Sequence, residues 1–178
     1  MEPIDTGRLI LRDFSPGDFE AFFAATNDPE YLQYYPQVET TRSFYKDIFE
    51  RILSGRKQIN RTKFQLAICL PEDHVIGTCG VRIEDTDNRQ ASFGCAIDRI
   101  HWGKGYAYEA SSSILSFGFS YLPVHRIYAE TISENLRARA LAERLGMRLE
   151  AELKDTKFFR GRWWDSVIYA VLEDEWKQ

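Results

Sequence analysis

The segment Trp102-Gly103-Lys104-Gly105-Tyr106-Ala107 lies between two stretches of different periodicity. Apolar residues alternate over residues 92–98, which is typical of a strand, and a helix-like pattern then runs to about Tyr121. Two glycines one residue apart let the backbone turn tightly, because glycine has no Cβ. The free N–H groups of the following helix can then point at one anion, and the helix dipole adds positive potential. The segment therefore predicts a phosphate or pyrophosphate site, with an ordinary strand-to-helix turn as the alternative.

The composition is that of a globular protein, and we expect one domain over residues 1–178. Hydrophobic residues make up 44% of the chain and charged residues 28%, which argues against a disordered or fibrous chain. The net charge of −4 argues against broad nucleic-acid binding, which needs a basic surface. A mildly acidic protein is compatible with amines or other cationic small substrates.

The cysteines and the apolar segments bear on the cellular compartment. Cys69, Cys79 and Cys95 all lie in predicted strands, and an odd number favours reduced, buried thiols over disulfides or a metal site. The first five residues are acidic and carry no apolar run, so we expect no signal peptide. No segment approaches the ~18 apolar residues that span a bilayer. These features predict a cytoplasmic protein without metal, membrane or nucleic-acid partners.

Turn and cap signals divide the chain into strands and helices. Strands are predicted over residues 8–12, 64–68, 75–82, 91–98, 126–132, 148–158 and 163–172. Helices are predicted over residues 16–27, from Thr40 or Thr41 to about residue 53, from the glycine turn to about residue 121, and over residues 136–145. Residues 31–36 are predicted as an aromatic loop. The expected fold is mixed α/β (α+β), with a central, mostly antiparallel twisted sheet of about seven strands flanked by about four helices.

The order of these elements and four motifs carry a resemblance to a known family. The motifs are residues 6–12 (TGRLILR), 75–78 (VIGT), 102–110 (WGKGYAYEA) and the pair 134–135 (EN) followed by 143–147 (ERLGM). Together they resemble the GNAT superfamily of acetyl-CoA-dependent N-acetyltransferases, in the branch of the bacterial ribosomal-protein alanine N-acetyltransferases. The resemblance spans nearly the whole chain in the right order.

The resemblance implies a cofactor site around the glycine turn. Backbone N–H groups of the turn would hold the pyrophosphate of acetyl-CoA, and the pantetheine arm would pair with the strand that ends near Ile97. A backbone N–H of that strand would stabilise the oxyanion of the tetrahedral intermediate. Asn135 would hydrogen-bond the pantetheine arm, with a helix cap as its alternative role. The implied cofactor-binding residues are Ile97, Trp102, Gly103, Lys104, Gly105, Tyr106, Ala107 and Asn135.

Three acid–base positions of the family are empty in this chain. The branch has a serine general acid where Ala138 stands, the wider superfamily a tyrosine at Ala142 and a glutamate at Ser92. The catalytic residues are therefore unknown, and the candidates are Tyr169, Glu84 and Ser92, with His101 and Glu109 as further ones. Four of them also have a structural interpretation: Tyr169 as a core residue, Glu84 as a solvated strand end, His101 as a surface loop residue and Glu109 as an acid at a helix N-terminus.

The expected function is acetyl transfer from acetyl-CoA to a primary amine by direct attack in a ternary complex. The amine would be a protein N-terminus or a small molecule such as a polyamine or an amino sugar, and a homodimer is possible. The alternative, favoured by Ala138, Ala142 and Ser92, is a CoA-binding protein with little or no transferase activity. A third reading is an unrelated phosphate-binding α/β domain.

Overall fold

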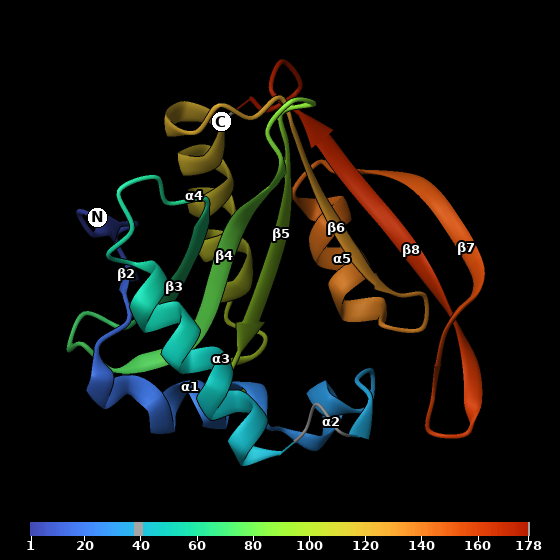
Figure 1. Cartoon of the computed structure of the whole chain (residues 1–178), viewed down its shortest axis with the longest axis horizontal. Helices are drawn as coiled ribbons and strands as arrows, with labels where there is room; N and C mark the ends of the chain where they lie inside the picture. Colours follow the sequence, from blue (N-terminus) through green and yellow to red (C-terminus); the bar gives the residue numbers. More distant parts are fainter. Residues whose placement is uncertain (38–40, 178) are drawn as a thin grey trace.

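The computed structural model describes residues 1–37 and 41–177, and within them one mixed sheet of eight strands (Figure 1). The strands are β1 (Ile4–Asp5), β2 (Ile10–Asp13), β3 (Lys63–Cys69), β4 (Val75–Asp85), β5 (Gln90–Ile97), β6 (Arg126–Ile132), β7 (Arg148–Phe159) and β8 (Arg162–Leu172). Their order in the sheet is β1-β2-β3-β4-β5-β6-β8-β7. All neighbours are antiparallel except β5 and β6. The predicted fold class is confirmed, and β1 is the strand that the sequence reading missed.

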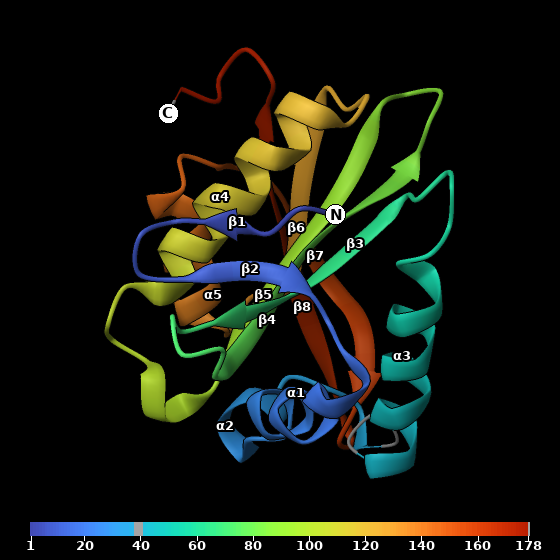
Figure 2. The same cartoon turned by 90° about the vertical axis from the view of Figure 1, so that its left-hand side faces the viewer.

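Helices cover both faces of this sheet. They are α1 (Phe19–Thr26), α2 (Pro29–Leu32), α3 (Arg42–Gly55), α4 (Tyr106–Tyr121) and α5 (Leu136–Arg144), with 3-10 turns η1 (Pro16–Asp18) and η3 (Arg99–His101). α1 and α3 pack on one face and α4 and α5 on the other, as Figure 2 shows. No helix in the described part of the chain has the length and apolar character to cross a bilayer.

The apolar side chains of β3 alternate between these two layers. Leu66 and Ile68 belong to the core beneath α4, whereas Ala67 and Cys69 belong to the core beneath α1 and α3. A strand buried on both faces needs apolar residues at consecutive positions. All four side chains are inaccessible to solvent, so β3 lies in the middle of the fold.

Local caps set the starts of α2 and α3. Thr41 caps α3, with its side chain accepting a hydrogen bond from the Phe44 N–H at 3.3 Å. The alternative cap, Thr40, lies outside the described residues. The Asp28 side chain accepts from the Glu30 N–H at 2.8 Å and starts α2, with Pro29 in its first turn. Part of the segment predicted as an aromatic loop is therefore a single helical turn.

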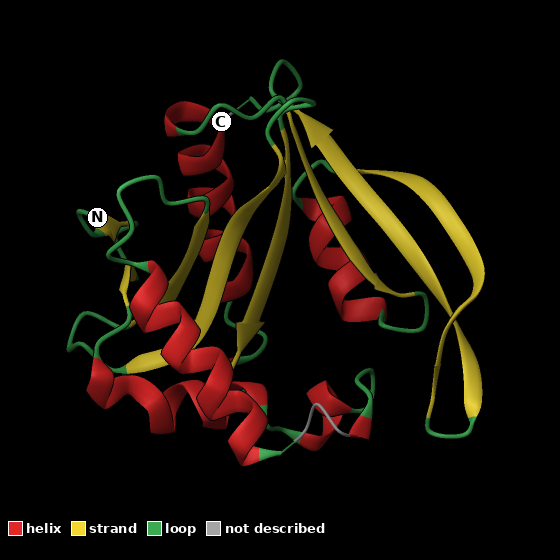
Figure 3. Ribbon diagram, in the orientation of Figure 1, coloured by secondary structure: helices red, strands yellow, loops and turns green. Residues whose placement is uncertain are grey.

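The sheet opens between β5 and β6. Their parallel pairing extends only from Gln90–Arg126 to Ser92–Tyr128, and β6 then continues alongside β8 as far as Ile132. Figures 1 and 3 show the two halves of the sheet joined at one end and spread apart at the other. The rest of β5 keeps its pairing with β4, so its opposite edge faces the opening.

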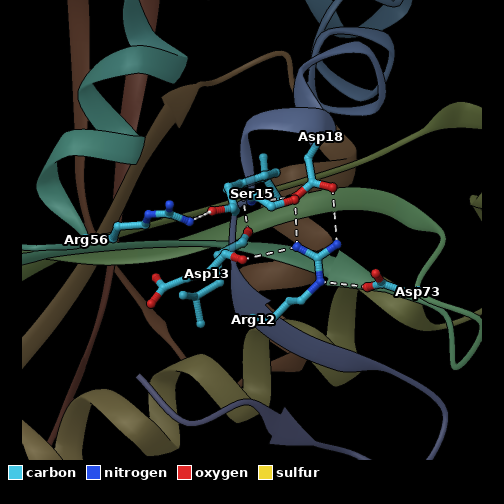
Figure 4. A network of polar contacts seen from close by, with 9 residues as sticks. Arg12, Asp13, Ser15, Asp18, Arg56 and Asp73 are labelled. Carbon is cyan, nitrogen blue, oxygen red and sulfur yellow. Dashed lines mark hydrogen bonds and ion pairs between the residues drawn. The ribbon is translucent and has the colours of Figure 1, made fainter.

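A polar network fixes β2 against its neighbours (Figure 4). The Arg12 guanidinium donates to Asp18 at 2.7 Å and to Asp73, in the β3–β4 turn, also at 2.7 Å. The Asp18 carboxylate also accepts from the Ser15 N–H at 2.7 Å. Burial acts to raise the pKa of Asp18, but the hydrogen bonds from Arg12 and Ser15 outweigh it and hold that pKa below its ordinary value.

Replacing Asp18 by asparagine is expected to lower the free energy of unfolding by about 2 kcal/mol, because Arg12 loses a half-buried charged partner. The folded-state pKa of Asp18 lies below the unfolded one, so the contribution is complete above about pH 4 and is lost as the pH falls through the folded value. Urea unfolding at pH 7 and pH 3 measures both effects. Glu20→Gln is the control, since its ion pair with Arg42 is exposed and is worth less than about 1 kcal/mol. Equal losses in the two variants would contradict this account.

Candidate active site

The glycine turn has the backbone conformation that the sequence predicts. Gly103 has φ of 75° and Gly105 has φ of 80°, in the left-handed region that glycine adopts without steric strain. Gly105 is the N-cap of α4, and the Glu109 N–H donates to its carbonyl at 3.1 Å. The N–H groups of residues 106–108, between Gly105 and Glu109, therefore have no acceptor within the helix. The turn thus presents several backbone donors at the positive end of a 16-residue helix.

A cavity of about 410 Å³, here called the donor cavity, lies beside this turn. Its walls come from β5, the glycine turn, the first turn of α4, α5 and the α2 region. It brings together the predicted residues Ile97, Trp102, Gly103, Gly105, Tyr106, Ala107 and Asn135. Lys104 lies in the same turn but is not among the described lining residues. The sequence reading missed Cys95 and Ala96 of β5, which also line the cavity.

The edge of β5 that faces the donor cavity carries backbone groups that β6 does not pair. The Asp98 N–H donates to the Ile76 carbonyl at 2.8 Å, so it points toward β4. Because backbone groups alternate in direction along a strand, those of Ile97 and Cys95 point the other way, into the opening. The Trp102 indole N–H donates to the Ile97 carbonyl at 2.6 Å. The edge can therefore accept an extended ligand as an added strand, with the Ile97 carbonyl already engaged.

The N-terminal segment braces the glycine turn. Arg8 donates to the Lys104 carbonyl at 3.1 Å and pairs with Glu109 of α4, whose carboxylate also accepts from the Thr6 hydroxyl at 2.6 Å. The Arg8 guanidinium lies 5.1 Å from the centre of the Tyr106 ring. Glu109, a candidate acid or base, is thus engaged in holding this segment against α4. The sequence gives no local sign of this contact, because it joins residues about a hundred positions apart.

Arginines of α5 stand at the mouth of the donor cavity. Arg137 lies 4.5 Å from the centre of the Trp102 ring, and Arg144 lies 4.3 Å from that of Tyr108. All four of these residues line the cavity. The two arginines are seven positions apart, which places them on one face of a helix. This seven-residue spacing can be seen in the sequence. The two side chains supply positive charge where the phosphate groups of a cofactor would lie.

Ion pairs hold α2 across the same mouth. Glu30 of α2 lies 3.4 Å from Arg99 of η3 and 3.6 Å from Arg137 of α5. Asp28 lies 3.8 Å from the same Arg99. α2 is thus tied to η3 and to α5, and its one aromatic residue, Tyr31, lines the cavity.

Of the three α5 positions that the resemblance singles out, Asn135 and Ala138 line the donor cavity and Ala142 does not. The Asn135 side-chain oxygen caps α5 by accepting from the Ala138 N–H at 3.2 Å. This is the capping role weighed above, and it leaves the two amide N–H donors of Asn135 for a ligand. Ala138 lines the cavity without a hydroxyl, whereas Ala142 is buried in the core.

Tyr169 is a core residue in this structure. Its side chain is 1% exposed, and its hydroxyl donates to Glu143 at 2.7 Å and accepts from Arg139 at 3.2 Å. Burial and the hydrogen bond to Glu143 raise the pKa of Tyr169 above its ordinary value. Tyr169 does not belong to the described lining of the donor cavity.

The other catalytic candidates separate into two places. The Ser92 hydroxyl donates to Glu84 at 2.6 Å, so the structure brings these two together, but neither is a described lining residue of the donor cavity. His101 does line it, contrary to its reading as a surface loop residue. Both its ring nitrogens are buried without a hydrogen-bond partner among the described residues. Burial and the charge of Lys104 lower the pKa of His101, so the imidazole is neutral at pH 7.

A second cavity, of about 500 Å³ and here called the acceptor cavity, adjoins the first. It lies between the end of the α2 region, β6 and β7, and Tyr34 and Asn135 line both cavities. The Tyr34 hydroxyl donates to the Glu134 carbonyl at 3.1 Å, which places its ring at the boundary. Glu130 and Lys157 form an ion pair of 3.1 Å on its wall.

The free N–H groups at the start of α4, the unpaired edge of β5 and the two adjoining cavities suit an extended ligand that carries phosphate groups, with room for a second ligand beside it. The chain matches the family model described as "Acetyltransferase (GNAT) domain" over residues 8–148, and it belongs to this family. The protein is an N-acetyltransferase with acetyl-CoA as its acetyl donor.

Similar proteins support this assignment. The chain is 33% identical over 181 residues to the uncharacterized N-acetyltransferase p20 of Bacillus licheniformis, covering 99% of both chains. A crystal structure of a GNAT-family acetyltransferase from Bacillus anthracis is 27% identical with a TM-score of 0.82, covering 98% of this chain and 100% of that one. The ribosomal-protein-S5-alanine acetyltransferase of Vibrio fischeri has a TM-score of 0.83 at 20% identity, covering 100% of both chains, and is similar in fold.

Proposed function

We propose that this protein acetylates a primary amine that enters the acceptor cavity while acetyl-CoA occupies the donor cavity. The observation that carries the proposal is the contact between the two cavities at Tyr34 and Asn135. A thioester in one cavity and an amine in the other would meet at this boundary. Holding both reactants at once is the geometry for direct attack in a ternary complex.

Named groups would hold acetyl-CoA. The N–H groups of the turn from Gly103 to Ala107 bind the pyrophosphate at the positive end of α4. Lys104, in that turn, and Arg137 and Arg144, at the cavity mouth, add positive charge for the phosphates. The pantetheine arm lies along the open edge of β5, with the amide donors of Asn135 on its other side.

The chemistry proceeds without a covalent enzyme intermediate. Cys95 is the thiol that lines the donor cavity, and burial raises its pKa to about 11, so it stays protonated at pH 7. A protonated thiol is a poor nucleophile, which leaves the amine itself to attack the thioester carbonyl. A backbone N–H of β5 near Ile97 would stabilise the oxyanion that forms.

The acceptor cavity is suited to an amine. The Glu130 carboxylate, which pairs with Lys157, can also accept a hydrogen bond from the neutral amine. Aromatic side chains of Tyr34, Tyr35 and Phe159 supply apolar surface for the rest of the acceptor. The acceptor is therefore a protein N-terminus or a small amine. The Vibrio fischeri relative, by its name, acts on an alanine of ribosomal protein S5.

A panel of amines tests the proposal. We expect amine-dependent release of the CoA thiol from acetyl-CoA with at least one of a peptide with N-terminal alanine, spermidine and glucosamine. Initial rates at varied concentrations of both substrates should give intersecting lines, as a ternary complex requires. CoA binding without amine-dependent thiol release across the panel would instead indicate a CoA-binding protein. Parallel lines would indicate a covalent acetyl-enzyme.

A further inference from the structure

Two tyrosines with hydrogen-bonded hydroxyl groups line the two cavities, one in each. The hydroxyls of Tyr31 and Tyr35 share a hydrogen bond of 2.8 Å, and their rings are stacked with centroids 4.9 Å apart. Tyr31 lines the donor cavity, whereas Tyr35 lines the acceptor cavity. The pair therefore forms a hydrogen-bonded bridge between the place of the thioester and the place of the amine.

We propose that the Tyr31–Tyr35 pair relays a proton from the attacking nitrogen to the departing sulfur. The inference rests on the proposed acetyl transfer. When the C–N bond has formed and the C–S bond breaks, the nitrogen gives a proton to the Tyr35 oxygen. The Tyr35 proton passes to the Tyr31 oxygen, and the Tyr31 proton passes to sulfur. The products are an amide and a neutral thiol, and both tyrosines end as they began.

The surroundings of Tyr31 suit a proton donor. Burial and the neighbouring Tyr35 raise the pKa of Tyr31 well above its ordinary value, so the phenol is fully protonated at neutral pH. Tyr31 shares the lining of the donor cavity with Cys95, near the end of β5. On the α5 side Ala138, Ala140 and Leu141 carry no transferable proton, and Arg137 and Arg144, which also line the cavity, lie over the Trp102 and Tyr108 rings.

Contacts of the neighbouring residues support the Tyr31–Tyr35 pair. The two tyrosines are four residues apart, and the Tyr35 N–H donates to the Leu32 carbonyl at 3.0 Å, extending the turn of α2. The ion pairs of Glu30 with Arg99 and Arg137 fix this turn across the cavity mouth. A relay needs a short distance between its oxygens, which the hydrogen bond of 2.8 Å and the stacked rings supply.

Tyr31→Phe and Tyr35→Phe test the relay, because both keep the stacked ring and remove one hydroxyl. With the most active amine of the panel, each is expected to lower kcat about 100-fold and to leave the dissociation constant of CoA unchanged. The double variant is expected to lose little more than either single one, since one break stops the relay. The solvent deuterium isotope effect on kcat should involve three protons in the unaltered enzyme and fall in both variants. Tyr121→Phe, at a side chain 77% exposed on α4, is the control.

The outcomes separate the relay from the transfer reaction itself. If the unaltered enzyme transfers acetyl groups and both variants keep its kcat and isotope effect, the relay is wrong and the proposed function stands. Additive losses with an unchanged isotope effect would also overturn the relay, because they indicate a packing role. If the unaltered enzyme releases no thiol with any amine, the proposed function fails and the relay fails with it.

Discussion

Replacing Gly105 by aspartate is expected to raise the dissociation constant of CoA at least about 100-fold, which corresponds to about 2.7 kcal/mol. At φ of 80° a side chain strains the backbone at the start of α4. The new carboxylate also places a negative charge where the N–H groups and the helix dipole attract the pyrophosphate. A Cβ at this position lies 3.5 Å from Arg8, so the carboxylate competes with Glu109 for it as well. Isothermal titration with CoA measures the change.

Gly146→Asp is the matched control for this substitution. Gly146 has φ of 79°, so the backbone strain is the same, and no atom lies within 4 Å of its added Cβ. It ends α5 and is not a described lining residue of either cavity. We expect its CoA affinity to stay within about threefold of the unaltered value. Unchanged CoA binding in Gly105→Asp would show that the pyrophosphate lies elsewhere.

Replacing Ala138 by tryptophan is expected to abolish the rise in Tm that CoA produces in the unaltered protein. The donor cavity has a volume of about 410 Å³, and Ala138 lies on its α5 wall. An indole at this position fills the space that the pantetheine arm needs beside β5. At CoA concentrations 100 times the dissociation constant, ligand binding stabilises by about 2.7 kcal/mol, or about 5 °C or more in Tm.

Leu136→Trp is the control for the filled cavity. Leu136 is on the same helix but 70% exposed, and it is not a described lining residue of the donor cavity. Its CoA-dependent shift in Tm should match that of the unaltered protein. A full shift in Ala138→Trp would contradict the placement of the cofactor between β5 and α5.

The elements with strong local signals could be predicted from the sequence, and the missed ones are short. The bounds of β6 (Arg126–Ile132) agree with those expected, because β-branched and aromatic residues fill it. β1 has two residues, too few for an alternating pattern. α2 was predicted as a loop, although Asp28 followed by Pro29 is a helix-start signal. The separation of β5 from β6 depends on long-range pairing, which no local pattern encodes.

The same distinction holds within the site. The conformation of Gly103 and Gly105 was predictable, because it depends on the residues of the turn themselves. The contact of Arg8 with Glu109 was not, because it forms only when distant segments fold together. The hydroxyl pair of Tyr31 and Tyr35 has a four-residue spacing, but its meaning depends on the two cavities that it joins.

A crystal structure of the complex with CoA tests the position of the cofactor most directly. We expect pyrophosphate oxygens within about 3.2 Å of backbone nitrogens in the turn from Gly103 to Ala107. The pantetheine arm should lie along β5 beside Cys95 and Ile97, with its sulfur near the Tyr31 hydroxyl. CoA bound away from the glycine turn, or with its pantetheine arm outside the opening between β5 and β6, would contradict the account.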